Sequence, residues 1–236
     1  MIVRTGTSGF AYKEWKGSFY PEELPASAML GYYAERLAAV EINNTFYRMP
    51  KATVLESWAE QVPDGFTFVL KAPRHITHIK RLKEADQPLA FLMENARSLG
   101  PALGPILVQL PPNLKRDDDR LAAFLALLPV DARFAFEFRN ATWFDEAIYD
   151  MLRAYGAALC IADTDESTDP FVTTAHWGYL RLRRTAYDEP DLLEWAARLS
   201  RAPWEEAFVF FKHEDAGTGP RLAARFAEIV GAKAVS

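Results

Sequence analysis

The chain has 236 residues, half of them hydrophobic, which is enough for one large core or two small ones. We expect a single domain over residues 1–236. A quarter of the residues are charged, but the net charge is only −5. This balance excludes a disordered chain and a globally basic nucleic-acid-binding protein, while it leaves room for a local basic patch.

Two features of the sequence bear on the compartment of the protein. The longest apolar run, 121–130, is far shorter than the roughly 20 residues that a membrane span requires, and Met1 leads directly into an expected strand. We therefore expect no membrane anchor and no signal peptide. Cys160 is the only cysteine and lies in an apolar run, where a buried inert thiol is expected. Because no disulfide can form within the chain, we expect a cytoplasmic protein.

Short apolar runs rich in β-branched and aromatic residues recur along the chain and predict strands. The first run follows Met1 directly, and an aromatic-rich segment comes after it. The later runs follow segments with helical periodicity or polar turn residues. About eight strands are expected, at 2–5, 40–42, 66–71, 105–109, 133–138, 158–162, 178–182 and 207–211.

Helical stripes lie between most of these strands. Leu30, Tyr33 and Leu37 recur at i, i+3 and i+7, which is typical of a helix that buries one face. Thr53 and Glu56 have the spacing of a capping box and predict the start of another helix. The expected helices contain residues 25–37, 53–62, 88–99, 117–128, 145–155, 190–199 and 222–229.

Strands that alternate with helices at this spacing pair in parallel through βαβ crossovers. About eight such units in a chain of this length predict an α/β fold, a single (β/α)8 barrel of the TIM type. Residues 163–175 show no helical stripe, so the helix between the sixth and seventh strands is expected to be short or missing. The rival is an open doubly wound sheet, but Gly6-Thr-Ser-Gly9 lacks the glycine spacing of a dinucleotide-binding turn.

The stretch 39–50 is unusual because a β-branched run stops abruptly in polar and aromatic residues. Alternation places Val40 and Ile42 on one side of the strand and Glu41 and Asn43 on the other. In a TIM barrel, reactive residues collect at the C-terminal ends of the strands. We therefore expect Glu41 and Asn43 to leave the strand end together and to contribute to a site.

Other expected strands end in polar residues of the same kind. Charged and apolar residues alternate at these ends, as in Phe136-Glu137-Phe138-Arg139, so the charged ones are expected to face one mouth. The candidates for catalysis are Glu41, Lys71, Glu137 and Asp163. The candidates for substrate binding are Asn43, Tyr12, Trp15, Arg74, His75, His78, Gln109, Arg139 and Arg181.

Several uncommon strings occur in one order along the chain. They are Gly6-Thr-Ser-Gly-Phe10, Trp15-Lys-Gly-Ser-Phe-Tyr-Pro21, Val40-Glu-Ile-Asn-Asn-Thr-Phe-Tyr-Arg48, Lys71-Ala-Pro-Arg-His-Ile-Thr-His78 and Glu137-Phe-Arg139. Together they closely resemble the YecE-like family (domain of unknown function 72), over nearly the whole chain. The resemblance implies a TIM-type barrel and brings no established reaction. Family members often carry an Asn-rich string at the eighth strand, whereas this chain has Phe211-Lys-His-Glu-Asp215, so no role is inferred for Lys212 or His213.

The expected mouth is cationic although the chain is acidic. Among the candidate site residues, lysine and arginine side chains outnumber the carboxylates. Guanidinium groups bind phosphate or carboxylate through two hydrogen bonds, and a cleft of one charge concentrates ligands of the other. Tyr12 and Trp15 belong to an aromatic loop that can stack on a sugar or base. We predict a small anionic, phosphate-bearing substrate or a nucleic acid, with nucleotides among the candidates.

Each candidate also has a structural interpretation. Glu137 and Arg139 can form an internal ion pair, because buried charges generally need partners. Glu41 can cap loop amides, and Asp163 can cap a turn. Lys71 can form a Schiff base, bind phosphate, or pair with a neighbouring acid.

A metal ion is a further hypothesis. Three carboxylates, Glu41, Glu137 and Asp163, would suit a divalent cation such as magnesium or manganese. His75 and His78 have a spacing that gives only weak evidence for a metal site, and structural hydrogen bonding is favoured for them. The sequence therefore names no metal ligand and leaves a divalent cation open as a cofactor.

Two classes of function fit these residues. In the first, the protein is a hydrolase, lyase or isomerase in which Glu41 or Glu137 acts as general acid or base while the cations hold an anion. In the second, it is a non-catalytic protein that binds nucleic acid or a phosphorylated metabolite. The acids among the cations favour the enzyme, because a pure anion binder gains nothing from carboxylates in its mouth. The reaction and the oligomeric state stay open.

Overall fold

Eight parallel strands close into a barrel in the order β1 to β8, in a computed structural model that describes residues 1–213 and 215–232. The predicted TIM-type barrel is therefore confirmed, and the open sheet is wrong. β8 pairs with β1 and closes the barrel. The strands are β1 (Ile2–Ser8), β2 (Ala39–Ile42), β3 (Thr67–Lys71), β4 (Leu103–Gln109), β5 (Phe134–Glu137), β6 (Ala158–Asp163), β7 (Trp177–Leu182) and β8 (Glu206–Phe211).

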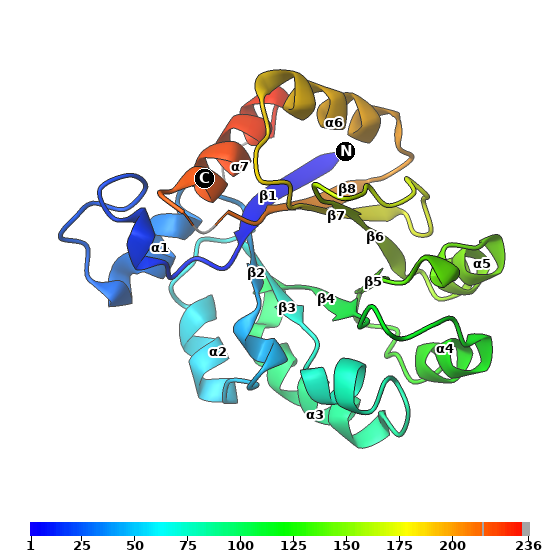
Figure 1. Cartoon of the computed structure of the whole chain (residues 1–236). Helices are drawn as coiled ribbons and strands as arrows, with labels where there is room; N and C mark the ends of the chain where they lie inside the picture. The colour runs from blue at the N-terminus through cyan, green and yellow to red at the C-terminus, as the bar shows by residue number, and fades with distance from the viewer. Residues whose placement is uncertain (214, 233–236) are drawn as a thin grey trace.

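Helices surround the barrel on its outside (Figure 1). They are α1 (Met29–Ala34), α2 (Ala52–Ala59), α3 (Asp86–Ala96), α4 (Asp118–Leu125), α5 (Glu146–Ala154), α6 (Glu189–Arg201) and α7 (Thr218–Ile229). Residues 164–176, between β6 and β7, contain no helix, as the missing stripe predicted. Within the described part of the chain, no helix has the length and apolar character needed to cross a bilayer.

Alternation along the strands divides the core into two parts. Outward side chains such as Val40 and Ile42 pack beneath the helices in one large apolar cluster. Inward side chains, including Ala39, Cys160 and Tyr179, fill the barrel in a second cluster. Burial raises the pKa of the Cys160 thiol well above its ordinary value, which agrees with the expected inert cysteine.

Local capping signals explain the start of some helices but not of all. α4 begins after Asp117, whose carboxylate accepts a hydrogen bond from the backbone N–H of Arg120 at 3.1 Å. The capping box predicted for Thr53 and Glu56 is wrong. α2 begins directly after Lys51, so Thr53 already lies inside the helix, and no side chain caps the first turn.

The close approach of β1 and β2 gives the first testable prediction. Gly6 pairs with Ala39, and a Cβ added to Gly6 would lie 1.8 Å from the carbonyl oxygen of Ala39. Because Gly6→Ala must push the two strands apart, we expect it to lower the free energy of unfolding by about 3 kcal/mol. Urea denaturation measures this change.

Gly31 in α1 is the matched control for this substitution. A Cβ added there would have its nearest contact at 3.7 Å. Gly31→Ala should therefore leave stability unchanged or raise it by up to about 1 kcal/mol, since alanine is the better helix former. If Gly6→Ala and Gly31→Ala lower the free energy of unfolding equally, the close approach of β1 and β2 is not the cause of the loss.

Candidate functional site

Arg181 lies at the centre of the C-terminal end of the barrel. It comes from β7, and its side chain is only 2% exposed. The guanidinium donates to Glu41 Oε1, on β2, at 2.8 Å and to Glu137 Oε2, on β5, at 2.5 Å. One buried cation thus joins two carboxylates that stand on separate strands.

Glu41 receives hydrogen bonds on both of its carboxylate oxygens. Ser8 and Arg181 donate to Oε1, each at 2.8 Å, and the Tyr179 hydroxyl donates to Oε2 at 2.7 Å. Burial disfavours the charged form, but the Arg181 charge and these hydrogen bonds lower the pKa of Glu41 below its ordinary value. Glu41 is therefore an ionised, fully buried carboxylate.

Glu137 is held in the same way. The side-chain amide of Gln109, on β4, donates to both oxygens at 2.8 Å, and Arg139 Nε donates to Oε1 at 2.9 Å. Against the effect of burial, Arg181 and Arg139 hold the pKa of Glu137 well below its ordinary value. The internal ion pair of Glu137 with Arg139, which was one interpretation of the sequence, is present.

A cavity of about 650 Å³ opens above these buried ion pairs. Eight of its lining residues were candidates from the sequence, namely Tyr12, Asn43, Lys71, Arg74, His78, Gln109, Arg139 and Arg181. Its cationic lining residues are Lys71, Arg74, Arg139, Arg181, Arg183 and Lys212. Of the described residues that line it, none is a carboxylate. The mouth is therefore strongly positive, as the sequence predicted.

Lys71 is a half-buried cation in the wall of this cavity. Its ammonium lies 4.3 Å from the ring centroid of Phe46. It makes no ion pair with a carboxylate of the residues that the structure describes. Burial, followed by the charge of Arg181, lowers the pKa of Lys71 to about 8. Lys71 can therefore exchange a proton close to neutral pH.

His78 lies beside Lys71 at the edge of the cavity. Its ring meets the ring of Phe46 edge to face, with the centroids 4.8 Å apart. Nδ1 lies 2.9 Å from the Thr77 hydroxyl. Burial and the charge of Lys71 lower the pKa of His78, so the neutral ring is favoured. His78 thus adds a polar and aromatic surface to the mouth and no further charge at neutral pH.

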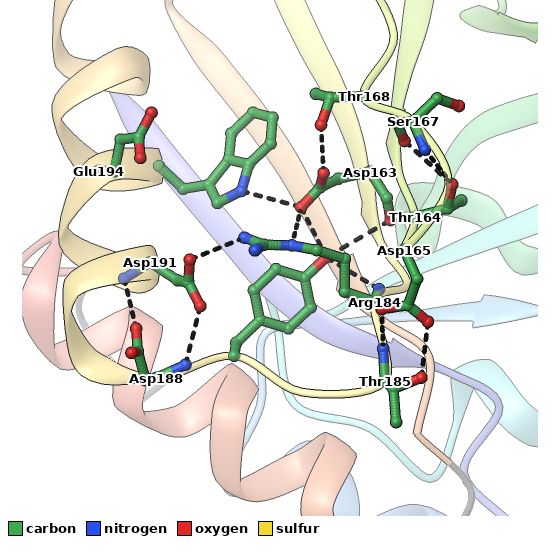
Figure 2. A network of polar contacts seen from close by, with 12 residues as sticks. Asp163, Thr164, Asp165, Ser167, Thr168, Arg184, Thr185, Asp188, Asp191 and Glu194 are labelled. Atoms are coloured by element: carbon green, nitrogen blue, oxygen red, sulfur yellow. Dashed lines mark hydrogen bonds and ion pairs between the residues drawn. The ribbon is translucent and has the colours of Figure 1, made fainter.

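Asp163 was expected in the mouth, but its side chain points in the opposite direction. Because Cys160 faces the interior, alternation turns the end of β6 so that Asp163 faces α6. Its carboxylate accepts hydrogen bonds from Arg184 at 2.8 Å, Tyr187 at 2.9 Å and Trp195 at 3.2 Å, and the bond from Arg184 is drawn in Figure 2. The expected convergence of Asp163 with the other acids does not occur.

This placement also bears on the hypothesis of a metal ion. The three carboxylates considered for a divalent cation do not gather, and the two in the barrel are paired with Arg181. Residues 1–213 and 215–232 contain no group of three or more His, Cys, Asp or Glu side chains that could hold a metal ion. His75 and His78 likewise form no such group.

Two further candidates do not reach the cavity. Trp15 has no exposed surface and packs against Tyr12, with the ring centroids 4.7 Å apart, and against Tyr20 at 6.1 Å. His75 is exposed at the start of the turn His75–Ile79 and is not part of the cavity wall. The aromatic loop therefore contributes Tyr12 to the mouth, while Trp15 anchors the loop.

The candidate set also missed residues that the structure brings to the site. Tyr179 stands two residues before Arg181, so strand alternation from Arg181 would have found it. Arg183, at the end of the same strand, also lines the cavity. Phe46, under the Lys71 ammonium, belongs to the polar and aromatic string that follows β2. Lys212 lines the cavity although no role was inferred for it.

A closed (β/α)8 barrel with a cationic C-terminal mouth defines the class to which this protein belongs. A family model described as "Protein of unknown function DUF72" matches residues 4–236, so the chain belongs to the DUF72 family. This confirms the resemblance seen in the sequence strings.

Curated relatives match part of the chain. The UPF0759 protein YecE of Escherichia coli (strain K12) is 33% identical over 113 residues, which are 48% of this chain and 42% of YecE. The UPF0759 protein YunF of Bacillus subtilis (strain 168) is 25% identical over 146 residues, which are 58% of this chain and 52% of YunF. The matches therefore span about half the length of these relatives.

Solved structures share the fold over almost the whole chain. A DUF72 family protein from Thermotoga maritima MSB8 has a TM-score of 0.87 at 27% identity, with 98% of this chain and 100% of that chain covered. One from Enterococcus faecalis V583 has a TM-score of 0.83 at 18% identity, with 98% and 96% covered, which shows a likeness of fold alone.

The buried ion pairs give the second prediction. Arg181→Met removes the cation and leaves Glu41 and Glu137 buried without it. We expect the free energy of unfolding to fall by about 3–5 kcal/mol at neutral pH, because an uncompensated buried charge is costly. Arg198→Met is the control, since the ion pair of Arg198 with Glu194 lies on the surface and should contribute less than about 1 kcal/mol.

The stability difference between wild type and Arg181→Met should depend on pH. The depressed pKa values of Glu41 and Glu137 contribute stability that is present above the ordinary value of 4.5 and is lost as the pH falls through the folded values. In the variant, burial acts on Glu41 without the Arg181 charge, so the pKa of Glu41 should rise and its protonation should lower the cost of burying it, while Arg139 still pairs with Glu137. Urea denaturation should show the difference shrinking as the pH falls from about 7 to about 4. A constant difference would argue against ionised partners.

Proposed function

We propose that the mouth binds a phosphate-bearing ligand and acts on it by general acid/base chemistry, with Lys71 as the group that exchanges a proton. The observation that carries this proposal is the set of six cationic side chains around one cavity of about 650 Å³. Guanidinium groups pair with phosphate through two hydrogen bonds, and ammonium groups pair with it as point charges. Nucleotides and nucleic-acid-derived molecules carry the required charge.

Six cations line the cavity, while the described residues place two carboxylates beneath it. Glu41 and Glu137 both pair with Arg181, and Glu137 also pairs with Arg139. Lys71 and Arg74 have no carboxylate partner among the described residues. Arg183 approaches Glu137 no closer than 3.9 Å. The excess positive charge therefore faces the cavity, where a ligand of several negative charges can balance it.

The two buried carboxylates have a positioning role in this proposal. The sequence suggested that Glu41 or Glu137 exchanges a proton with the substrate. Both carboxylates have lowered pKa values, and all their oxygens accept hydrogen bonds, which favours a positioning role. In this role they hold the Arg181 guanidinium toward the cavity. Lys71, with a pKa of about 8, is then the acid that protonates a leaving oxygen as the phosphorus–oxygen bond breaks. Water supplies the new oxygen, and the proton that this water loses restores the Lys71 ammonium.

A non-catalytic anion binder is the second candidate. It is favoured by the absence of a carboxylate base from the described lining of the cavity. In such a protein, Lys71 contributes charge alone. The two candidates differ in what happens when Lys71 keeps its charge but loses its ability to exchange a proton near neutral pH.

Anion binding gives the third prediction. Sulfate keeps its charge where a phosphate monoester titrates, near about pH 6, so it reports on the protein alone. Sulfate affinity should fall as the pH rises through about 8, because Lys71 loses its proton there. Below that pH, Lys71→Met should bind sulfate about tenfold more weakly than the wild type does. Its sulfate affinity should change little as the pH rises through about 8. Isothermal titration calorimetry measures both effects.

Arg97→Met is the control for the sulfate experiment, because Arg97 forms an exposed ion pair with Asp131, outside the mouth. It should bind sulfate as the wild type does. If sulfate, phosphate and pyrophosphate stabilise the wild type no more than chloride does at equal ionic strength, the proposed anion site is wrong.

The fourth prediction separates catalysis from binding. Lys71→Arg keeps a positive charge but cannot release a proton near neutral pH. In an enzyme, kcat should fall by about 100-fold or more while KM changes only a few-fold. The assay follows product formation by mass spectrometry from phosphomonoesters, phosphodiesters and nucleotides that first pass a binding screen. A binder would show no turnover of any ligand that it holds, and Lys71→Arg would bind as the wild type does.

A further inference from the structure

The cavity in the mouth adjoins two others at the same end of the barrel. It shares Arg139 and Arg183 with a cavity of about 410 Å³. It shares Asn44 and Tyr47 with a cavity of about 560 Å³ on its other side. These residues lie at or just after the C-terminal ends of strands, so the three cavities form one line across this end of the barrel, here called the groove.

The groove crosses the mouth from one side to the other. The cavity of about 410 Å³ is built mainly by the segments after β5 and β6, and the cavity of about 560 Å³ by the segment after β2. In a closed barrel with the strand order β1 to β8, β2 and β6 stand opposite each other. The three volumes together exceed the roughly 300–1,000 Å³ of a small-molecule pocket, which favours an extended ligand.

An exposed aromatic platform marks the β2 side of the groove. Tyr47 is 73% exposed, and its ring meets Phe46 edge to face with the centroids 5.0 Å apart. Arg48 and Lys51 line the adjoining cavity. An aromatic ring held next to cations suits a base that stacks while its phosphates are neutralised. Tyr47 lines both the mouth and the adjoining cavity, and most of its side chain is open to solvent.

The opposite end of the groove has the composition of a pocket for a polar ring. Phe144 supplies an aromatic surface, while Thr164, Ser167 and Asp169 supply hydrogen-bonding groups. These three residues come from the segment that replaces the missing helix between β6 and β7. Burial raises the pKa of Asp169 to about 6. Hydroxyl and carboxyl groups beside an aromatic face can read the hydrogen-bonding edge of an unpaired base.

We propose that the groove binds single-stranded nucleic acid. One base enters the pocket at Phe144, the phosphates cross the cationic mouth, and a neighbouring base stacks on Tyr47. Cations along a groove with aromatic side chains at its two ends are the arrangement that holds a strand through its backbone and its bases. A duplex is excluded, because its bases are paired and unavailable for stacking. This inference rests on the proposed binding of phosphate in the mouth and extends it to a class of ligand.

The test measures binding of the full chain to fluorescently labelled oligonucleotides of increasing length, from one nucleotide to about eight, by anisotropy. Affinity should rise over the first few nucleotides and then level off. Tyr47→Ala should weaken oligonucleotide binding at least about fivefold, and by more than it weakens pyrophosphate binding, because pyrophosphate has no base to stack. Tyr155→Ala is the matched control, because this tyrosine is 50% exposed at the end of α5 and lies outside the groove.

The charges of the groove give a second readout. Binding of a single strand should weaken as the salt concentration rises. The double variant Arg48→Met, Lys51→Met should reduce the slope of log affinity against log salt concentration by about 0.7 for each phosphate contact that it loses. These side chains are at least partly exposed, so the variants are expected to fold. If the double variant has a smaller salt slope and unchanged pyrophosphate binding, the nucleic-acid strand extends from the mouth past the segment that follows β2.

Several results would overturn the inference. A single nucleotide that binds as tightly as any longer strand would confine the ligand to the mouth. A loss in Tyr155→Ala as large as that in Tyr47→Ala would show that Tyr47 does not stack on a base. A duplex or heparin that binds as tightly as the single strand would show attraction by charge alone. Absence of pyrophosphate binding would instead refute the phosphate site itself, so the two failures are distinguishable.

Discussion

The pairing of Arg181 with Glu41 and Glu137 is the interaction on which the rest of the mouth depends. Three ionised groups lie almost fully buried at the end of the barrel, and each would be too costly there without the others. Their hydrogen bonds connect β7 to β2 and to β5, on separate parts of the barrel wall. This pairing occupies both acids of the interior, and among the described residues Lys71 and Arg74 face the cavity without a carboxylate partner.

This arrangement explains how an acidic chain can present a basic site. The net charge of −5 is distributed over the surface, whereas the cations of the mouth come from β3, β5, β7, β8 and the segments after them. A concave site of one sign attracts a ligand of the opposite sign whatever the total charge of the protein. Burial, followed by the charge of Arg181, lowers the pKa of Lys71 in the same site.

The missing helix after β6 gives the barrel an asymmetry next to the mouth. Elsewhere a helix covers the wall and the segment after each strand returns to the outside. Between β6 and β7 the chain instead supplies Thr164, Ser167 and Asp169 to a cavity next to the mouth. A polar segment without a helical stripe was visible in the sequence, but its contribution to a pocket depends on how it folds back beside Phe144.

The sequence alone determined the barrel, the missing helix and the strand ends that carry Glu41, Lys71, Glu137 and Arg139, because alternation and helical periodicity are local signals. Only the tertiary structure decided which way each strand end faces and how deeply it is buried. β6 is buried on both sides, so its apolar run does not show which side faces inward, and Asp163 proved to face α6. Trp15 proved to be an anchor of its loop for a similar reason, since an aromatic residue suits packing as well as stacking. The lowered pKa values of the two buried acids, likewise, arise from Arg181, a residue that lies about 140 positions from Glu41 in the chain and meets it only when the barrel closes.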